Sequence, residues 1–278
     1  MSFPATAPTS VVDPYREITD AAPWRFLYRL NPLAKVAAVL PAIVLLVFVR
    51  DLRTPLVFLA LGYLVLLVGV RMSVRLALIL GLAVPAVALA IGLGLSLWTD
   101  AALVDDTAPV LQIGAWTLYA GALEIGFATG LRLAAILALS LIPGLSTTGP
   151  DLVRASIQQL RVPYRIGYTA LAAFRFVPRF GHELEVIRQA HRVRGANRGR
   201  GPIAAVRRWT SYVVPLLAGA IRHAERVALA MDARAFGAYA GRTERHLVPF
   251  RARDVVFAIL FWAASAAVFT TTFPWASA

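Results

Sequence analysis

Residues 120–142 read AGALEIGFATGLRLAAILALSLI, an apolar stretch long enough to cross a bilayer as an α-helix. Small residues recur at every fourth position, which places them on one face of that helix. That face consists of Ala122, Gly126, Gly130, Ala134 and Ala138. Such a strip lets another helix approach closely within lipid. Two roles follow equally well, packing inside this chain's own bundle and packing against a separate membrane subunit.

Arg132 lies near the middle of the same stretch. A cation at that depth is costly unless it is shielded from lipid. Glu124 is two helical turns away, which is too far for a direct pair within one helix. We therefore expect Arg132 to face a bundle interior, a water-filled space or a partner.

The composition is that of a membrane protein. Hydrophobic residues make up 59% of the 278 residues and the mean hydropathy is +0.68, which is too apolar for an ordinary soluble domain. Basic residues outnumber acidic ones by 28 to 15, so the net charge of +13 must gather in the few polar segments. The absence of cysteine excludes disulfides and thiolate metal sites.

Four further apolar runs accompany the opening stretch, at residues 33–49, 56–70, 76–98 and 255–273. They predict an all-α polytopic membrane protein with about five transmembrane helices. The expected organisation is a polar N-terminal tail (1–30), a membrane domain with four transmembrane helices (31–142), a cytoplasmic or interfacial helical region (143–253) and a C-terminal transmembrane helix (254–278).

Arginine and lysine are distributed unevenly over the polar segments, which predicts the orientation. The N-terminal tail, the turn at 71–75 and the arginine-rich region at 161–253 belong on one side, which is the cytoplasm. The acidic loop with Asp100, Asp105 and Asp106 then lies outside. Arg50 and Arg53 are a mild exception, partly offset by Asp51. Five spans place the N-terminus in the cytoplasm and the C-terminus outside.

Polar signals replace the apolar pattern after residue 142. Residues 146–151 (STTGPD) combine a capping residue, a first-turn proline and an acidic residue, which predicts a helix over 151–160. The apolar runs that follow, such as 213–217, are too short to span a bilayer.

Two basic helical segments between Gly181 and Gly241 each end in an arginine. In the first, starting at His182, one face carries Leu184, Ile187, His191 and Arg194, and Gly195 is placed to end the helix. In the second, starting at Ile221, the equivalent face carries Val227, Met231 and Arg234, with Gly237 beyond it. A guanidinium at such an end can donate to a carboxylate or to helix-end carbonyls of a partner. Arginines that face water or lipid headgroups are the alternative.

Signals for enzyme chemistry are weak. Lys35, the one lysine, follows no glycine-rich phosphate loop. The four histidines (His182, His191, His223 and His246) lack metal-ligand spacing, so we expect no metal site and no catalytic residue. A membrane transferase would need paired acidic or histidine groups on the cytoplasmic side, and a nucleic-acid-binding module would need interleaved aromatics.

Several short motifs occur in a specific order: NPLAK at 31–35, TTGPDL at 147–152, LRVP at 160–163, RFVP at 175–178 and AHRVRG at 190–195. Together with Val193-Arg194-Gly195 and Ala233-Arg234-Ala235 they resemble the transmembrane T component of energy-coupling factor (ECF) transporters, the EcfT/CbiQ/BioN family. The resemblance extends from about residue 30 to the end. Val193 stands where the family usually has alanine, and Ala235 where it usually has glycine.

The resemblance implies a non-enzymatic subunit of a bacterial cell-membrane importer. A T component joins two cytoplasmic ATPase subunits, which bind ATP and Mg²⁺, to a small membrane S component that binds a vitamin or a metal ion. It needs no cofactor of its own. Its two coupling helices would dock in ATPase grooves through Arg194 and Arg234 and their neighbours Val193, Gly195, Ala233 and Ala235. The small-residue strip would then be a candidate contact for the S component. The alternatives are a permease subunit of another ABC transporter type and an integral-membrane transferase.

Overall fold

The computed structural model describes residues 25–100, 104, 106–113, 116–195, 201–239, 241, 243–244 and 246–272. These residues are almost entirely helical, which confirms the predicted all-α class. The chain divides into two compact units, Met1–Thr148 with Pro249–Ala278 and Gly149–Val248. We call them the membrane unit and the helical-pair unit. The functional boundaries expected at 143 and 253 stay predictions, and most of the expected N-terminal tail lies outside the described residues.

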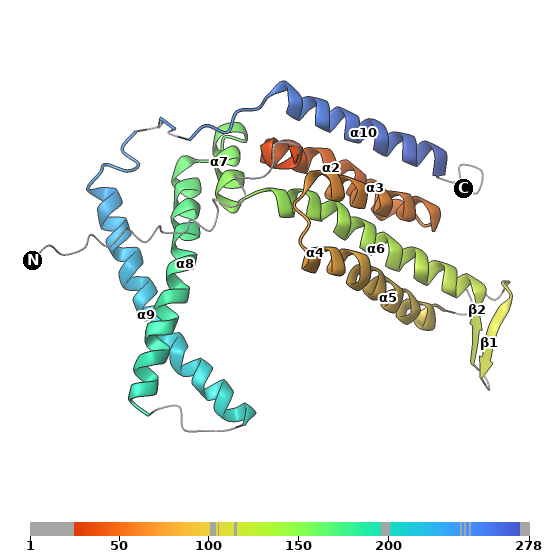
Figure 1. Ribbon diagram of the computed structural model, residues 1–278, viewed down its shortest axis with the longest axis horizontal. Helices are drawn as coiled ribbons and strands as arrows, with labels where there is room; N and C mark the ends of the chain where they lie inside the picture. Colours follow the sequence, from red (N-terminus) through yellow and green to blue (C-terminus); the bar gives the residue numbers. More distant parts are fainter. Residues whose placement is uncertain are drawn as a thin grey trace, which may run out of the picture. The chain divides into compact units, whose positions relative to one another are not determined.

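The membrane unit is built from helices that lie side by side in Figure 1. It contains η1 (Phe26–Arg29), α2 (Pro32–Phe48), α3 (Arg53–Gly69), α4 (Val74–Leu78), η2 (Ile79–Ala83), α5 (Val84–Trp98), α6 (Ala120–Ser146) and α10 (Ala252–Thr272). The π-helical segment η2 joins α4 to α5, so the chain is helical without interruption from Val74 to Trp98. α6 packs on α5, α3 and α2, and α10 packs on α2 and α3.

Three of these helical segments are long and apolar enough to cross a membrane: Val74–Trp98, Ala120–Ser146 and Ala252–Thr272. They correspond to the third, fourth and fifth predicted spans. The helices α2 and α3 are apolar but have 17 residues each. Their length of about 25 Å is below the roughly 30 Å of a bilayer core. The polytopic class is confirmed, and the count of five spans stays a prediction for these two helices.

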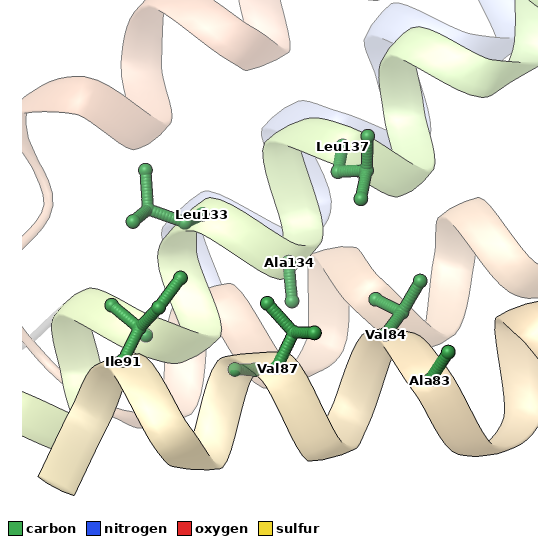
Figure 2. A pocket seen from close by; sticks show the side chains of 9 residues that line it. Ala83, Val84, Val87, Ile91, Leu133, Ala134 and Leu137 are labelled. Carbon is green, nitrogen blue, oxygen red and sulfur yellow. The ribbon is translucent and has the colours of Figure 1, made fainter. Parts of the chain in front are cut away.

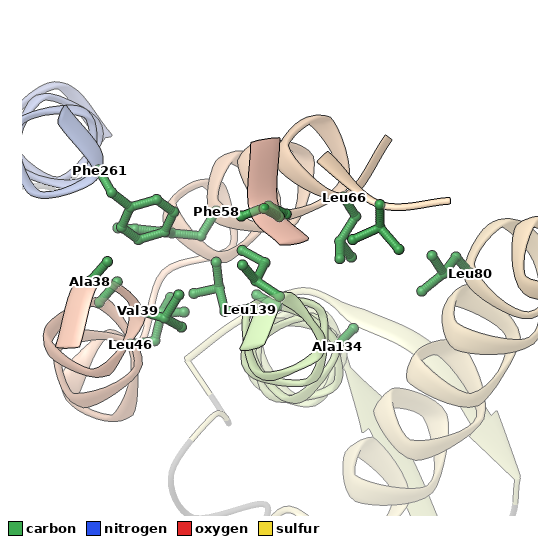
Figure 3. Close-up of a cluster of buried hydrophobic side chains, with 14 of the residues drawn as sticks. Ala38, Val39, Leu46, Phe58, Leu66, Leu80, Ala134, Leu139 and Phe261 are labelled. Carbon is green, nitrogen blue, oxygen red and sulfur yellow. The ribbon is translucent and has the colours of Figure 1, made fainter. Parts of the chain in front are cut away.

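The core of the membrane unit lies between α2, α3, α6 and α10. Figure 3 shows Phe58 of α3 packed near Phe261 of α10, with Leu139 of α6 beside them. Phe58 and Leu139 are completely buried. Each aliphatic or aromatic side chain of this kind contributes roughly 1.5–3 kcal/mol when it leaves water. Within a bilayer the same packing acts through close contact rather than through exclusion of water.

The small-residue strip of α6 lies inside this bundle, and all five of its members are buried. A Cβ at Gly126 would collide with Ser96 Oγ and Gly92 O of α5, and one at Gly130 would collide with Ala88 O. The backbone of α5 therefore packs directly against the small-residue strip at Gly126 and Gly130. A further contact of the strip with a separate membrane subunit stays a prediction.

Arg132 has its partners on a neighbouring helix, as one of the expected environments requires. Its guanidinium donates to Val49 O at 2.9 Å and to Val47 O at 3.4 Å, and it also donates to Thr129 Oγ1 at 3.2 Å. Val49 is the residue directly after the last residue of α2, Phe48. The carbonyls at a helix C-terminus lack intrahelical partners, so Arg132 satisfies α2 there.

A short β-hairpin lies between α5 and α6, where the sequence predicted only an acidic loop. Strands β1 (Pro109–Ile113) and β2 (Trp116–Tyr119) pair antiparallel, with Leu111 opposite Leu118. The turn before β1 is held by Thr107, whose Oγ1 accepts a hydrogen bond from Gly121 N at 3.1 Å. Asp105 of the expected acidic loop lies outside the described residues.

The helical-pair unit contains α7 (Gly149–Gln159), α8 (Tyr164–Val193) and α9 (Pro202–Asp232). The start of α7 agrees with the capping signal before Asp151. The two arginine-ended segments, expected from about 182 and 221, are wrong in length, because α8 and α9 continue through Pro178 and Pro215. An internal proline removes one backbone hydrogen bond, and the packing of α8 on α9 compensates for that loss.

Candidate coupling helix ends

The end of α8 is defined by Gly195. Arg194 follows the last helical residue, Val193, and its N–H donates to Ala190 O at 3.1 Å. Gly195 then adopts a left-handed φ of 68° and its N–H donates to Arg192 O at 3.1 Å. Glycine suits this conformation because it has no Cβ to collide with the backbone. The predicted role of Gly195 as the helix stop is confirmed.

The end of α9 likewise has a left-handed residue directly after its arginine, with alanine in place of glycine. Ala235 adopts a φ of 52° and its N–H donates to Asp232 O at 2.9 Å. Phe236 N donates to Met231 O at 3.0 Å, which completes a Schellman motif. The position at which the family usually has glycine is thus a left-handed position in this chain.

Arg194 and Arg234 occupy the same place in these two ends, immediately before the left-handed residue. Neither arginine is a residue of α8 or α9 itself, because these helices end at Val193 and Asp232; the expectation that the arginines are the last residues of the two helical faces was therefore wrong by one residue for Arg194 and by two for Arg234. Both side chains are exposed, as are their neighbours Val193, Ala233 and Ala235. Within the described residues, neither guanidinium forms a salt bridge.

The apolar stripes expected to lead up to the arginines are partly covered inside the unit. His191 of α8 meets the ring of Tyr212 of α9 at 5.3 Å, and Phe176 stacks on His223 at 4.5 Å. Leu184 and Ile187 of the first stripe are half-buried. The apolar surface that remains open beside the two ends belongs to Val193, which is 88% exposed, and to Leu229, which is 68% exposed.

An aromatic bracket fixes the end of α9. The ring of Phe236 makes edge contacts with Tyr164 at 5.6 Å and with Tyr168 at 6.2 Å, both near the start of α8. Arg165 donates to Gly237 O, and Tyr164 OH donates to Tyr239 O at 2.6 Å. These residues were not singled out from the sequence. Aromatic residues three and four positions from one another around Pro163 and Gly237 were the available signal.

The return segment after this bracket is bound to α7. Gln158 donates to His246 O at 2.8 Å and accepts from Val248 N at 2.9 Å, while Gln159 donates to Val248 O at 2.9 Å. The backbone of this non-helical segment thus finds partners in two glutamine side chains. The end of α9, the start of α8 and the end of α7 consequently form one connected network.

The membrane unit also contains an apolar groove of about 190 Å³ between α5 and α6. Figure 2 shows Val87 and Ile91 of α5 facing Leu133 and Leu137 of α6. Every side chain that lines it is apolar, so the groove offers no side-chain hydrogen bond for recognition of a polar substrate. Among the described residues no three metal-binding side chains come together.

The fold and the two helix ends define a multi-pass helical membrane protein whose helical pair presents two exposed arginines, neither of which forms a salt bridge with a described residue. Residues 24–246 match the CbiQ family, described as cobalt transport protein, and the chain belongs to this family. The predicted family is thereby confirmed.

Three relatives have informative names. The chain is 27% identical over 172 residues to an energy-coupling factor transporter transmembrane protein EcfT of Bacillus selenitireducens, covering 59% of this chain and 64% of the relative. It is 25% identical over 245 residues to an EcfT of Streptococcus equi subsp. equi, covering 84% and 88%. A putative ABC transporter ATP-binding protein of Bifidobacterium longum is 29% identical over 159 residues, covering 54% of this chain and 20% of that protein. The chain thus spans less than two thirds of the length of several relatives.

Proposed function

We propose that this chain is the transmembrane T component of an ECF-type ABC importer, and that Arg194 and Arg234 are the contacts of two ATPase subunits. The observation that carries this is the repeated cap geometry, which presents two arginines in one backbone setting on two packed helices. Two equivalent ends fit two similar ATPase subunits. The names of the EcfT relatives support the same assignment.

The chemistry of each end suits a protein groove. Arg194 and Arg234 carry charge without an internal salt bridge among the described residues, so each can pair with a carboxylate or helix-end carbonyls of a partner. Val193 and Leu229 add exposed apolar area beside them. The left-handed turn after each arginine fixes the backbone at that position, which reduces the entropy lost on docking.

The ATPase subunits bind ATP and Mg²⁺ in this proposal, and the chain itself is not an enzyme and carries no cofactor. A small membrane S component binds the cargo, a vitamin or a metal ion. The chain lies in the bacterial cell membrane with its N-terminus and helical-pair unit in the cytoplasm, as the distribution of arginine favours.

Arginine variants test the ATPase contacts. Arg194→Ala and Arg234→Ala should each weaken retention of the ATPase subunits by about tenfold or more, because a docked guanidinium leaves unpaired groups behind. Arg192→Ala is a matched control, since Arg192 is an exposed arginine two residues from Arg194. Membrane insertion should be unchanged in all three. Co-purification of ATPases and transport equal to the parent in both tip variants would refute the proposal.

The composition of the complex tests the partners. Purification in mild detergent should yield one copy of this chain, two ATPase subunits and one small membrane protein. Two copies of this chain without the small protein would instead favour the alternative, a permease subunit of another ABC transporter type. Enzymatic conversion of lipid by the isolated chain would favour a transferase.

Cysteine labelling tests the orientation, because the chain has no cysteine of its own. We expect Asp106→Cys to react with a membrane-impermeant maleimide in intact spheroplasts. Asp232→Cys should react only after lysis. Both side chains are exposed, so a difference in labelling reports the side of the membrane rather than burial within the protein. The opposite pattern would reverse the proposed orientation.

A further inference from the structure

Three polar side chains are buried in the membrane unit where the chain leaves it and returns to it. Lys35 and Asp254 are each 1% exposed and Asn31 is 3% exposed. The chain leaves the membrane unit after Thr148 and re-enters it at Pro249. Burial of charged groups is unfavourable unless hydrogen bonds to the protein replace those to water. The hydrogen-bond partners of these residues therefore indicate which segments they fix in place.

Lys35 holds the outgoing connection. Its ammonium group donates to Ser146 O at 2.8 Å, to Ser146 Oγ at 3.0 Å and to Leu27 O at 3.2 Å. Ser146 is the last residue of α6, two residues before the membrane unit ends. A cation there complements the negative end of the helix dipole and the free terminal carbonyls.

Asp254 holds the returning connection. Its Oδ1 accepts from Asn31 N at 2.7 Å, and its Oδ2 accepts from Arg251 N at 2.7 Å. Asn31 Nδ2 donates to Pro249 O at 3.5 Å, and Arg253 donates to Arg29 O. The segment 249–254 is therefore bonded to the residues just before α2.

Both connections meet at one place, the N-terminus of α2. Asn31 caps this helix, because its Oδ1 accepts from Leu33 N at 2.9 Å, and Lys35 lies in the first turn. We call Asn31, Lys35, Ser146 and Asp254 the α2 anchor. The far end of α2 is held by Arg132, so the helix is bonded to α6 at both ends.

We propose that Lys35 and Asp254 are positioning residues that fix both connections of the helical-pair unit to α2, so that an ATP-driven movement reaches the membrane bundle through the α2 anchor. The inference rests on the proposed function. Loose polar connections would absorb such a movement by exchanging their hydrogen bonds with water. Buried groups whose hydrogen bonds are all satisfied exchange these bonds with water only at a high cost in free energy. They therefore transmit the movement to α2.

Hydrogen exchange of the assembled complex tests the inference without knowledge of the cargo. The complex with its ATPase subunits is compared in ADP and in ATP with vanadate. In the parent chain, trapping should change exchange both within residues 149–248 and at the ends of α2 and α6. Lys35→Met and Asp254→Asn should retain the ATPases and the change within 149–248. The change in α2 and α6 should fall by about fivefold or more, as expected for loss of an energetic coupling between sites.

Leu46→Ala is the matched control, because Leu46 is a fully buried residue of α2 outside the α2 anchor. It should lower thermal stability and leave the transmitted change intact. If Lys35→Met does not insert into the membrane, the milder variants Ser146→Ala and Asp254→Asn are used for the same measurement. Transmission equal to the parent in those variants would overturn the inference, as would the lack of any change in α2 and α6 of the parent. A parent that retains no ATPase subunit would refute the proposed function instead.

Discussion

Lys35 and Arg132 each cap the C-terminus of the other's helix. Lys35 of α2 donates to Ser146 O at the end of α6 at 2.8 Å, and Arg132 of α6 donates to Val49 O at the end of α2 at 2.9 Å. Each helix C-terminus has carbonyls without intrahelical partners and carries a partial negative charge. Each cation donates hydrogen bonds to such carbonyls and offsets the negative charge. The reciprocal arrangement explains why two cations are tolerated in an apolar bundle.

The first prediction follows for Arg132. Arg132→Ala leaves the carbonyls of Val47 and Val49 without their donor, so the bundle should lose about 1–3 kcal/mol of stability. The midpoint of thermal unfolding in detergent should fall. Arg50→Ala is the control, because Arg50 is an exposed cation next to Val49. An equal decrease in both variants would mean that charge, rather than the helix cap, matters.

The second prediction concerns the close approach of α5 and α6. Gly126→Ala should destabilise the bundle by about 1–3 kcal/mol, because the new methyl group would collide with Ser96 Oγ and the backbone of Gly92. Gly94→Ala on α5 has no atom within 4 Å of its new methyl and should be neutral or slightly stabilising. The midpoint of thermal unfolding is measured for both variants. Equal midpoints would contradict the close packing of α5 on α6.

The sequence predicted the elements whose signals are local. Apolar runs located the helices of the membrane unit, the proline and aspartate at 150–151 located the start of α7, and Gly195 located the end of α8. These signals work because hydropathy and capping act within a few residues. The class of the fold and the positions of both arginines followed from them.

Long-range relationships were not predictable in this way. Lys35 is hydrogen-bonded to Ser146, 111 positions away, and Asn31 is hydrogen-bonded to Asp254, 223 positions away. No local sequence pattern contains such partners. The NPLAK motif predicted the start of α2, with Asn31 as cap and Pro32 in the first turn, but it did not indicate the distant partners of Asn31 and Lys35. The full length of α8 and α9 depends on their mutual packing. The hairpin at 109–119 was missed because its two strands have only five and four residues and lie between two long apolar runs.

The third prediction uses the left-handed conformation of Ala235. A non-glycine residue at this φ of 52° is unfavourable by about 1–2 kcal/mol. Ala235→Gly should therefore slow hydrogen exchange at the end of α9, whereas Gly195→Ala should accelerate it at the end of α8. The two substitutions are reciprocal and serve as each other's control. Changes of the same sign in both would show that the turns are not equivalent.

The fourth prediction separates the position of Arg234 from its charge. Phe236 lies two residues beyond Arg234 and packs on Tyr164 and Tyr168, so it fixes the turn that presents the arginine. Phe236→Ala removes both ring contacts, which are each worth about 0.5–1.5 kcal/mol beyond their buried area. In the proposed complex, the affinity for the ATPase should fall by about tenfold although every charge is retained.

Phe236→Tyr and Tyr164→Phe are the controls for this prediction. Both retain the rings of the bracket, and Tyr164→Phe removes only the hydrogen bond to Tyr239 O. Each should weaken binding by less than Phe236→Ala does. The measurement is the dissociation constant of the ATPase subunits from the chain in nanodiscs. If Phe236→Ala binds as tightly as the parent, the aromatic bracket does not orient Arg234, because docking alone then suffices to order the turn.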